Sequence, residues 1–228
     1  MRLDDRLQAV ADFVPSGCRV ADIGTDHAYL AIELYKKDSS RFVIAADKNA
    51  GPCDAARRTI REAGLADAIE VRQGDGLGAL KAGEVNTVCI AGMGGKLIAD
   101  ILEAQPEIFE GLEYAVLQPQ NAALYLRQWL YEHGWHIEDE RLSKADGRIY
   151  QIMLARPGET AMPGQLELFA GPVILRRRQE LFSEYIKGLI EGQERIAAGL
   201  RQASSSSAAD GLSRVTEQII KLKELLTV

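Results

Sequence analysis

The sequence predicts an α/β domain built on a mostly parallel sheet, followed by an antiparallel helical hairpin of coiled-coil type. Short apolar runs alternate with amphipathic stretches between residues 17 and 155, as expected for a parallel sheet covered by helices on both faces. The chain has 228 residues, enough for one full α/β domain with a small appendage. An apolar spacing of three and four residues recurs after residue 172. We expect the domain to cover residues 1–160 and the hairpin to cover residues 172–228.

Each predicted strand is a short apolar run bounded by polar or glycine-containing segments. The last two runs pair as a hairpin around Ala145-Asp146-Gly147, so we expect the final strand of a seven-stranded sheet to be antiparallel. The predicted strands are 19–24, 41–47, 69–73, 86–91, 114–118, 135–142 and 149–155.

The predicted helices lie between these strands, and a leading helix is expected over residues 3–13. Pro52 near the first turn of one helix and Gly64 after its end are typical boundary residues, as is Gly134 after a later helix. The helices expected after the strands are 27–37, 52–63, 96–102 and 122–133.

The C-terminal part has a different pattern. Residues 156–171 contain Pro157-Gly158 and Pro163-Gly164, which predict a linker, and a helix is expected to start at Pro172. Residues 203–207, an alanine and four serines, predict a turn between two helices, which form either a packing or dimerisation arm or a substrate-binding arm. The apolar stripes are Phe182, Tyr185, Leu189, Ile196 and Leu200 in the first helix and Leu212, Val215, Ile219, Leu222 and Leu226 in the second.

Composition limits the class of protein. No run approaches the roughly 18 apolar residues that span a bilayer, and the first residues lack the apolar core of a signal peptide, so we expect a cytoplasmic protein without a membrane partner. The separated cysteines Cys18, Cys53 and Cys89 predict buried thiols and no metal site. The net charge of −6 argues mildly against a non-specific nucleic-acid binder, but the basic cluster 176–178 leaves local contact with nucleic acid open.

Four predicted strands end in residues suited to binding a ligand, and ligands bind beyond the carboxyl ends of strands in such sheets. After the first strand, Gly24 permits a sharp turn and close approach of a ligand to the backbone. Asp47 ends the second strand and suits ribose hydroxyls, while Asp75 follows the third and suits an adenine amino group. The fourth strand ends in the glycine-rich segment 91–95.

The acidic residues favour a cationic nucleoside ligand. Asp26 stands where a dinucleotide fold has its second glycine, and with Asp22 it disfavours a pyrophosphate. The sequence has no P-loop motif, so an NTPase is not expected. S-adenosylmethionine carries a sulfonium and an ammonium group besides its adenosine, and it fits all these residues.

The motifs DIGTDHAYL, AADKNAGP, GDGL, AGMGG and LQPQNA, in this order and before a helical hairpin, resemble the bacterial tRNA (adenine-22-N1)-methyltransferase (TrmK) family over essentially the whole chain. This resemblance implies a class I, Rossmann-like fold, S-adenosyl-L-methionine as cofactor, and methylation of N1 of an adenine in the D-arm region of tRNA. The cofactor contacts that it implies are Asp22, Gly24, Asp26, Asp47, Lys48, Asp75, Gly76, Gly92, Met93, Gly94 and Gly95.

Adenine N1 has an in-plane lone pair and attacks a sulfonium methyl directly, so orientation is the enzyme's main task. A positive charge develops on the ring, and a nearby carboxylate stabilises it. Asp26 is our first catalytic candidate and His27 the second, with Met93 as a wall of the pocket. The fourth strand lacks the Asn/Asp-Pro-Pro-aromatic motif of many exocyclic-amine methylases, which favours a ring nitrogen.

The target base of a folded tRNA has to leave its stack. We expect Tyr29, Gln118, Gln120 and Asn121 to receive the base by stacking and hydrogen bonds. The candidate phosphate contacts are Arg2, Arg6, Arg57, Arg58, Arg61, Lys96, Arg127, Arg176, Arg177 and Arg178.

Two other classes of function remain open. A small-molecule methyltransferase would suit the acidity and would keep its activity after removal of residues 172–228. A non-catalytic nucleotide-binding protein is disfavoured, because a relic tends to lose some cofactor motifs. Gly188 and Gly192 interrupt the first hairpin helix, so we expect an imperfect coil and a monomer.

Overall fold

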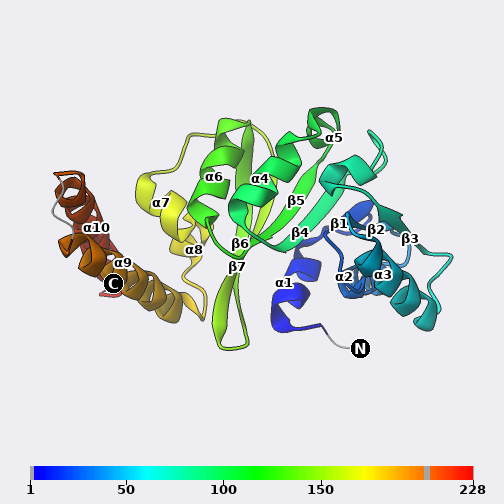
Figure 1. The fold of residues 1–228 in the computed structure, drawn as a ribbon, viewed down its shortest axis with the longest axis horizontal. Coiled ribbons are helices and arrows are strands. Elements are labelled where there is room, and N and C mark those ends of the chain that lie inside the picture. Colours follow the sequence, from blue (N-terminus) through cyan, green and yellow to red (C-terminus); the bar gives the residue numbers. More distant parts are fainter. Residues whose placement is uncertain (1–2, 203–205, 228) are drawn as a thin grey trace. The chain divides into compact units, whose positions relative to one another are not determined.

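The computed structural model describes residues 3–202 and 206–227 (Figure 1). Contacts divide the chain into two compact units, Met1–Met162 and Pro163–Val228. Among the described residues, no helix combines the length and the apolar character needed to cross a membrane.

The first unit is built on a seven-stranded sheet of order β3-β2-β1-β4-β5-β7-β6. Strand β7 runs antiparallel to β5 and β6, and the other neighbouring strands are parallel, which confirms the predicted sheet with its antiparallel last strand. The strands are β1 (Val20–Ile23), β2 (Val43–Asp47), β3 (Ile69–Gln73), β4 (Thr87–Met93), β5 (Tyr114–Pro119), β6 (Trp135–Ala145) and β7 (Arg148–Pro157).

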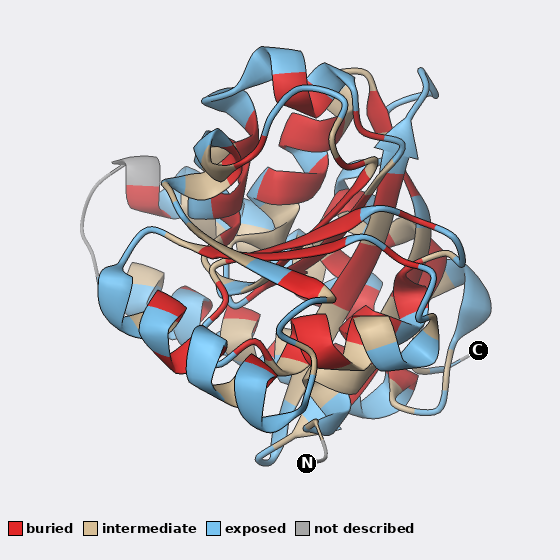
Figure 2. Cartoon of the chain, turned by 90° about the vertical axis from the view of Figure 1, so that its right-hand side faces the viewer, coloured by how far each residue is buried: buried red, intermediate tan, exposed pale blue. Residues whose placement is uncertain are grey.

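The central strands are mostly apolar because helices cover the sheet on both faces. Every residue of β1 is buried, as are the first four residues of β2 and of β4 (Figure 2). Cys18, Cys53 and Cys89 are buried free thiols, as their sequence context predicts. The core therefore fixes the strand ends, where the candidate ligand-binding residues lie.

The helices of the first unit begin and end within a few residues of their predicted bounds. Helix α2 starts at Tyr29 rather than at residue 27, because Ala28 adopts a left-handed conformation (φ 58°) that no helix can include. The sequence analysis missed η1 (Gly76–Ala79) and α5 (Pro106–Glu110), which are too short for a periodic signal. The remaining helices are α1 (Asp5–Phe13), α2 (Tyr29–Lys37), α3 (Ala50–Glu62), α4 (Gly95–Glu103) and α6 (Ala123–Glu132).

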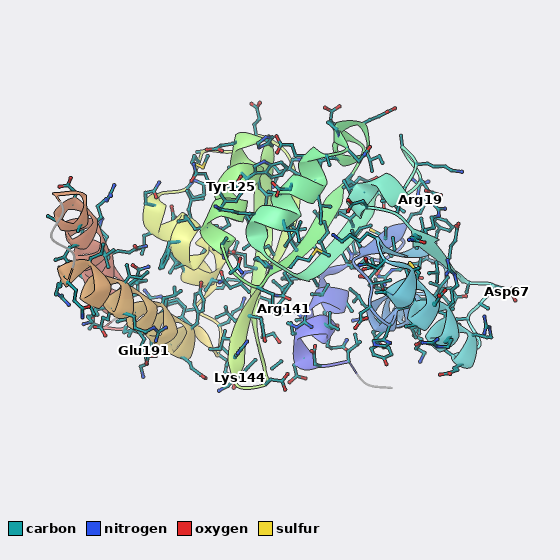
Figure 3. All side chains as sticks on the ribbon, viewed as in Figure 1. Arg19, Asp67, Tyr125, Arg141, Lys144 and Glu191 are labelled. Carbon is teal, nitrogen blue, oxygen red and sulfur yellow. The ribbon has the colours of Figure 1, made fainter. Side chains whose placement is uncertain are left out.

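Helix α1 packs on the sheet through β6 and β7 and also touches β4 and β5. The Asp4 side chain caps it by accepting a hydrogen bond from the Leu7 N–H at 2.7 Å. Arg141 of β6 holds its C-terminal end, because the guanidinium lies 4.8 Å from the centre of the Phe13 ring and 3.4 Å from the Asp12 carboxylate (Figure 3). An N-terminal segment is thus attached to strands more than 70 residues away in sequence.

The second unit contains a helix inside the predicted linker. Residues Gln165–Ala170 form α7, which buries Leu168 and Ala170, and the Tyr185 hydroxyl donates to the Ala170 carbonyl at 3.0 Å. The linker prediction is therefore wrong for these residues, because Glu167 accepts a hydrogen bond from the Gly164 N–H at 2.8 Å and starts a helix directly after the Pro163-Gly164 pair. Helix α8 (Pro172–Arg177) begins at the predicted proline.

The second unit ends in two packed helices, α9 (Phe182–Arg201) and α10 (Ser206–Glu224). They run antiparallel, since Lys223 pairs with Glu194 at 2.9 Å while Gly211 lies beside Leu200. The predicted turn falls partly on residues 203–205, which lie outside the described residues, and its last two serines belong to α10.

Only Phe182 and Tyr185 of the predicted stripe of α9 are buried, and Ile186 and Ile190 are buried in addition. Ile196 is half exposed, with 50% of its surface accessible, whereas Gln193 and Ala197 are buried in its place. The prediction selected Ile196 because it is apolar. In a helix of 3.6 residues per turn, however, Gln193 and Ala197 lie on the buried face.

Arg127 of α6, a predicted phosphate contact, lies in the core of the first unit. It is fully buried, its Nε donates to Glu140 Oε1 at 2.8 Å, and its Nη2 donates to Gln151 Oε1 at 2.5 Å. Glu140 of β6 is equally buried. The phosphate-contact prediction is therefore wrong for Arg127, which joins α6 to the β6–β7 pair as one half of a buried ion pair.

Removing this cation is expected to destabilise the first unit strongly. Arg127→Met keeps most of the side-chain volume but removes the guanidinium from the buried Glu140 carboxylate, so we expect the free energy of unfolding to fall by about 3–5 kcal/mol. Arg57→Met is the matched control, because the Arg57–Asp54 pair is exposed and its loss should cost less than about 1 kcal/mol. Urea denaturation of both variants measures the difference, and equal losses would contradict this role for Arg127.

Candidate active site

A cavity of about 230 Å³ opens at the carboxyl ends of β1 and β4. Strand β1 lies between β2 and β4 in the sheet, so the chain leaves β1 at the point where the strand order reverses. This switch point is where open α/β sheets bind their ligands. The cavity is lined by Arg6, Leu7, Asp22, Gly24, Thr25, Asp26, His27, Ala28, Tyr29, Leu30, Ala91 and Gly92.

Asp22 is the buried acid of this cavity, with only 6% of its surface exposed. The pKa of its carboxyl is raised to about 6, because burial raises it, interaction with the Thr25 hydroxyl lowers it by less, and the nearby Asp47 also raises it. A cation that enters the cavity stabilises the charged form of this carboxyl, so the buried Asp22 favours binding of a cationic ligand.

The turn between β1 and α2 brings the backbone of Gly24 to the cavity. The N–H groups of Gly24 and Thr25 both donate to the Ala46 carbonyl, at 2.8 and 2.9 Å, which ties the turn to β2. Gly24 adopts φ +80°, and a Cβ there would overlap the terminal methyl of Met93. Met93 therefore covers the face of Gly24 that a ligand would approach, and its flexible thioether is the group that has to move.

Asp26, His27 and Tyr29 stand at the mouth of the cavity. The side chains of Asp26 and His27 are 78% and 46% exposed, and His27 Nε2 lies 3.4 Å from Asp26 Oδ2. The His27 and Tyr29 rings stack with their centres 5.2 Å apart and their planes 16° from parallel. The sequence-predicted catalytic candidates and one predicted base contact are thus brought together.

Asp47 ends β2 next to this cavity without lining it. Its Oδ1 accepts hydrogen bonds from the Asn49 N–H at 2.7 Å and from Asn49 Nδ2 at 3.2 Å, which fixes the carboxylate at the strand end. The carbonyl of the exposed Lys48 accepts a hydrogen bond from Gln73 Nε2 at 3.1 Å. This edge is therefore ordered before any ligand arrives.

The end of β3 is shaped by two glycines with close neighbours. A Cβ on Gly74 would lie 2.7 Å from the Ala79 Cα, and one on Gly76 would lie 2.9 Å from Ile101 Cγ2. Asp75 between them is exposed, and its carbonyl accepts a hydrogen bond from the Gly78 N–H at 3.0 Å. The predicted residues Asp75 and Gly76 lie at the neighbouring strand end, outside the lining of the β1–β4 cavity.

The glycine-rich loop after β4 is joined to the segment after β5. The Gln120 N–H donates to the Met93 carbonyl at 2.8 Å, and the Gly95 N–H donates to the Asn121 carbonyl at 3.0 Å. A Cβ on Gly95 would meet the Ala122 carbonyl oxygen at 2.5 Å, so this position accepts only glycine. A Cβ on Gly94 would lie 3.1 Å from Oδ1 of the Asn121 side chain.

Gln118, a predicted base contact, is an internal residue of this junction. It is fully buried, its Oε1 accepts hydrogen bonds from the Gly92 N–H at 3.0 Å and from Arg6 Nη1 at 2.8 Å, and its Nε2 donates to the Pro119 carbonyl at 3.0 Å. Because the side chain is fully buried and both of its polar atoms have internal partners, it presents no exposed group to a base, and that prediction is wrong. Gln120 and Asn121 are exposed at the same edge.

The predicted phosphate contacts divide into exposed and internal residues. Arg6 is only 17% exposed and Arg127 is buried, and Arg2 lies outside the described residues. Those on the surface are Arg57, Arg58, Arg61 and Lys96 in the first unit and Arg176, Arg177 and Arg178 in the second.

Sequence reasoning missed three residues at this edge. Thr25 lies buried in the cavity, and its place inside the DIGTD motif was the available signal. Tyr125 of α6 is 42% exposed with Lys96 Nζ 5.5 Å from its ring centre (Figure 3). Tyr150 of β7 lies 5.6 Å from the Arg6 guanidinium, a pairing that no local pattern reveals.

Comparisons with known proteins identify relatives over nearly the full length. Residues 20–224 match the family model described as TrmK, tRNA (adenine(22)-N(1))-methyltransferase. The chain is 34% identical to the tRNA (adenine(22)-N(1))-methyltransferase of Bacillus subtilis, covering 99% of this chain and 98% of that protein.

Solved structures give the same result. The crystal structure of the Bacillus subtilis m1A22 tRNA methyltransferase TrmK is 33% identical, with a TM-score of 0.88 and 98% of each chain covered. A Streptococcus pneumoniae protein in complex with S-adenosyl-L-methionine is 30% identical, with a TM-score of 0.86, covering 99% of this chain and 100% of that one.

The raised pKa of Asp22 makes the stability of the ligand-free protein depend on pH. The folded carboxyl titrates near pH 6 and the unfolded one near pH 3.8, so the folded state binds more protons between these values and loses stability as the pH rises through them. Asp22→Asn removes this loss, and we expect the variant to unfold with a free energy on the order of 2 kcal/mol higher at pH 7.5 and equal at pH 3.5. Denaturation of parent and variant at both pH values tests this, and a difference in free energy of unfolding that is the same at both pH values would contradict it.

Proposed function

The chain belongs to the TrmK family of tRNA (adenine(22)-N(1))-methyltransferases, and on this premise we propose that it transfers a methyl group from S-adenosylmethionine to N1 of adenine 22 in tRNA. The observation that carries the proposal is the buried Asp22 carboxyl in a cavity at the strand-order switch point, with Asp26 exposed at the mouth. Tyr29 and the exposed amides of Gln120 and Asn121 supply the polar and aromatic groups that a base requires. We further infer a cytoplasmic enzyme that acts as a monomer.

The residues of the cavity fit this cofactor. Its ammonium and sulfonium groups are the cations that the buried Asp22 carboxyl favours, and Gly24 offers backbone where a Cβ would leave no room. Asp47 is held at the neighbouring strand end and suits the ribose hydroxyls. The cofactor contacts that we propose are Asp22, Gly24, Asp26, Asp47, Lys48, Asp75, Gly76, Gly92, Met93, Gly94 and Gly95.

The bound cofactor supplies an electrophilic methyl, and the chain's own residues orient the acceptor. In the transfer the bond from carbon to N1 forms as the bond from carbon to sulfur breaks, and the sulfur keeps that electron pair. No base is needed, because N1 carries its own lone pair. Asp26 stabilises the positive charge that develops on the adenine, and the stacked His27 and Tyr29 rings orient the adenine ring.

The rest of the RNA is contacted by exposed cations of the first unit, in our proposal. Lys96 lies over the exposed Tyr125 ring near the cavity edge, so a phosphate and an unstacked base can be received together. Arg57, Arg58 and Arg61 add positive charge along α3. The basic residues 176–178 provide a further contact in the second unit.

The first test is methyl transfer to defined RNA. We expect labelled S-adenosylmethionine to methylate an unmodified tRNA transcript with adenosine at position 22, and digestion to release labelled 1-methyladenosine. A transcript with guanosine at that position is the control and should stay unlabelled. Cofactor binding is measured separately by calorimetry. If the cofactor binds but no RNA is labelled, tRNA is rejected as the substrate and a small-molecule acceptor is favoured.

Asp26 is expected to act on the chemical step. Asp26→Asn keeps the shape but removes the negative charge, so we expect kcat to fall about 10²–10³-fold with cofactor affinity changed only a few-fold. Asp67→Asn, at an exposed site in the turn before β3, is the matched control (Figure 3). Normal turnover of the Asp26 variant with intact cofactor binding would remove Asp26 from the chemistry.

A further inference from the structure

A chain of hydrogen bonds runs from the N-terminal helix to the wall of the cavity. Arg6 Nη1 of α1 donates to Gln118 Oε1 at 2.8 Å, and the same oxygen accepts the Gly92 N–H at 3.0 Å. Gln118 is fully buried, and Arg6 is only 17% exposed. Gln118 thus stands between a charged side chain and the backbone of the glycine-rich loop.

This contact fixes the Gly92 peptide, which lies where the β4–β5 ladder is interrupted. The pairing of β4 with β5 is interrupted between Ala91 and Met93, and Gly92 adopts φ +80° inside the interruption. A trans peptide places its N–H and carbonyl on opposite sides, so binding the Gly92 N–H to Gln118 also sets the direction of the Ala91 carbonyl. Ala91 and Gly92 both line the cavity, and Met93 covers Gly24.

Arg6 is itself held from several sides. Its guanidinium lies 5.6 Å from the centre of the Tyr150 ring of β7, and Nη2 lies 3.5 Å from Asp4 Oδ2. A hydrogen bond from a charged donor is stronger than one between neutral groups. The guanidinium therefore fixes the orientation of the Gln118 amide and keeps its oxygen toward Gly92.

We propose that Arg6 is a positioning residue of the transfer reaction, which acts through Gln118 to hold the Gly92 peptide and with it the part of the cavity wall that Ala91 and Gly92 form. The proposal replaces the phosphate contact expected from the sequence, since the guanidinium is mostly enclosed and already points at Gln118. Its kinetic part rests on the proposed function, whereas its structural part is independent of any substrate.

Hydrogen–deuterium exchange tests the structural part on the full chain. Arg6→Met should raise the exchange rate of amides 91–95 about tenfold, because Gln118 loses the partner that orients it. Arg141→Met is the matched control, since Arg141 also attaches α1 to the sheet, through Phe13 and Asp12, but does not contact Gln118. Equal exchange in parent and Arg6→Met, or equal increases in both variants, would overturn the proposal.

Steady-state kinetics test how Arg6 acts. We expect Arg6→Met to lower kcat about tenfold with little change in KM for tRNA, and Arg6→Lys to recover part of the rate because Nζ still donates. Gln118→Ala should lower kcat similarly, and the double variant should be no slower than either single variant within about twofold. Multiplying effects, or a rise in KM for tRNA alone, would instead identify Arg6 as a direct RNA contact.

The two proposals fail in different ways. A parent enzyme that binds S-adenosylmethionine but labels no tRNA contradicts the proposed function, and the exchange experiment still decides whether Arg6 holds the loop. A parent that methylates tRNA together with an Arg6→Met variant of unchanged kcat and unchanged exchange contradicts the role of Arg6 only.

Discussion

The ligand preference of the first unit depends on one constraint, the burial of the Asp22 carboxyl near the end of a central strand. A carboxyl group in that position has lost most of its hydration, which raises its pKa to about 6. The sheet can hold it there because β2 and β4 flank β1 along its whole length. The surrounding strand ends then present backbone and further carboxylates, so a cation is the natural complement of the cavity.

The sheet was predictable because its signal is local. The strands are apolar runs covered on both faces, and in a parallel sheet their carboxyl ends meet at one edge, so Asp22, Gly24, Asp47 and Asp75 could be assigned to neighbouring strand ends in advance. The start of α2 was misjudged because the left-handed turn at Ala28 leaves no periodic trace.

The direction of individual polar side chains was not predictable, because their partners are far away in sequence. Arg127 binds residues of two later strands, and Gln118 binds Arg6 and Gly92, so neither pairing has a spacing that can be read along the chain. An arginine on an amphipathic helix and a glutamine at the end of a strand are ordinarily surface residues. Only the folded arrangement shows that both are internal and hold elements together.

The Met93 side chain over Gly24 has a thermodynamic consequence. Its methyl already shields the glycine backbone from water in the ligand-free protein, so an arriving ligand exchanges one apolar contact for another at that point. The heat-capacity change on binding then reports less buried surface than the ligand's own area suggests, because the displaced thioether is re-exposed elsewhere. The heat-capacity change measured for a ligand at this site therefore depends on the new position of the Met93 side chain as well as on the surface of the ligand.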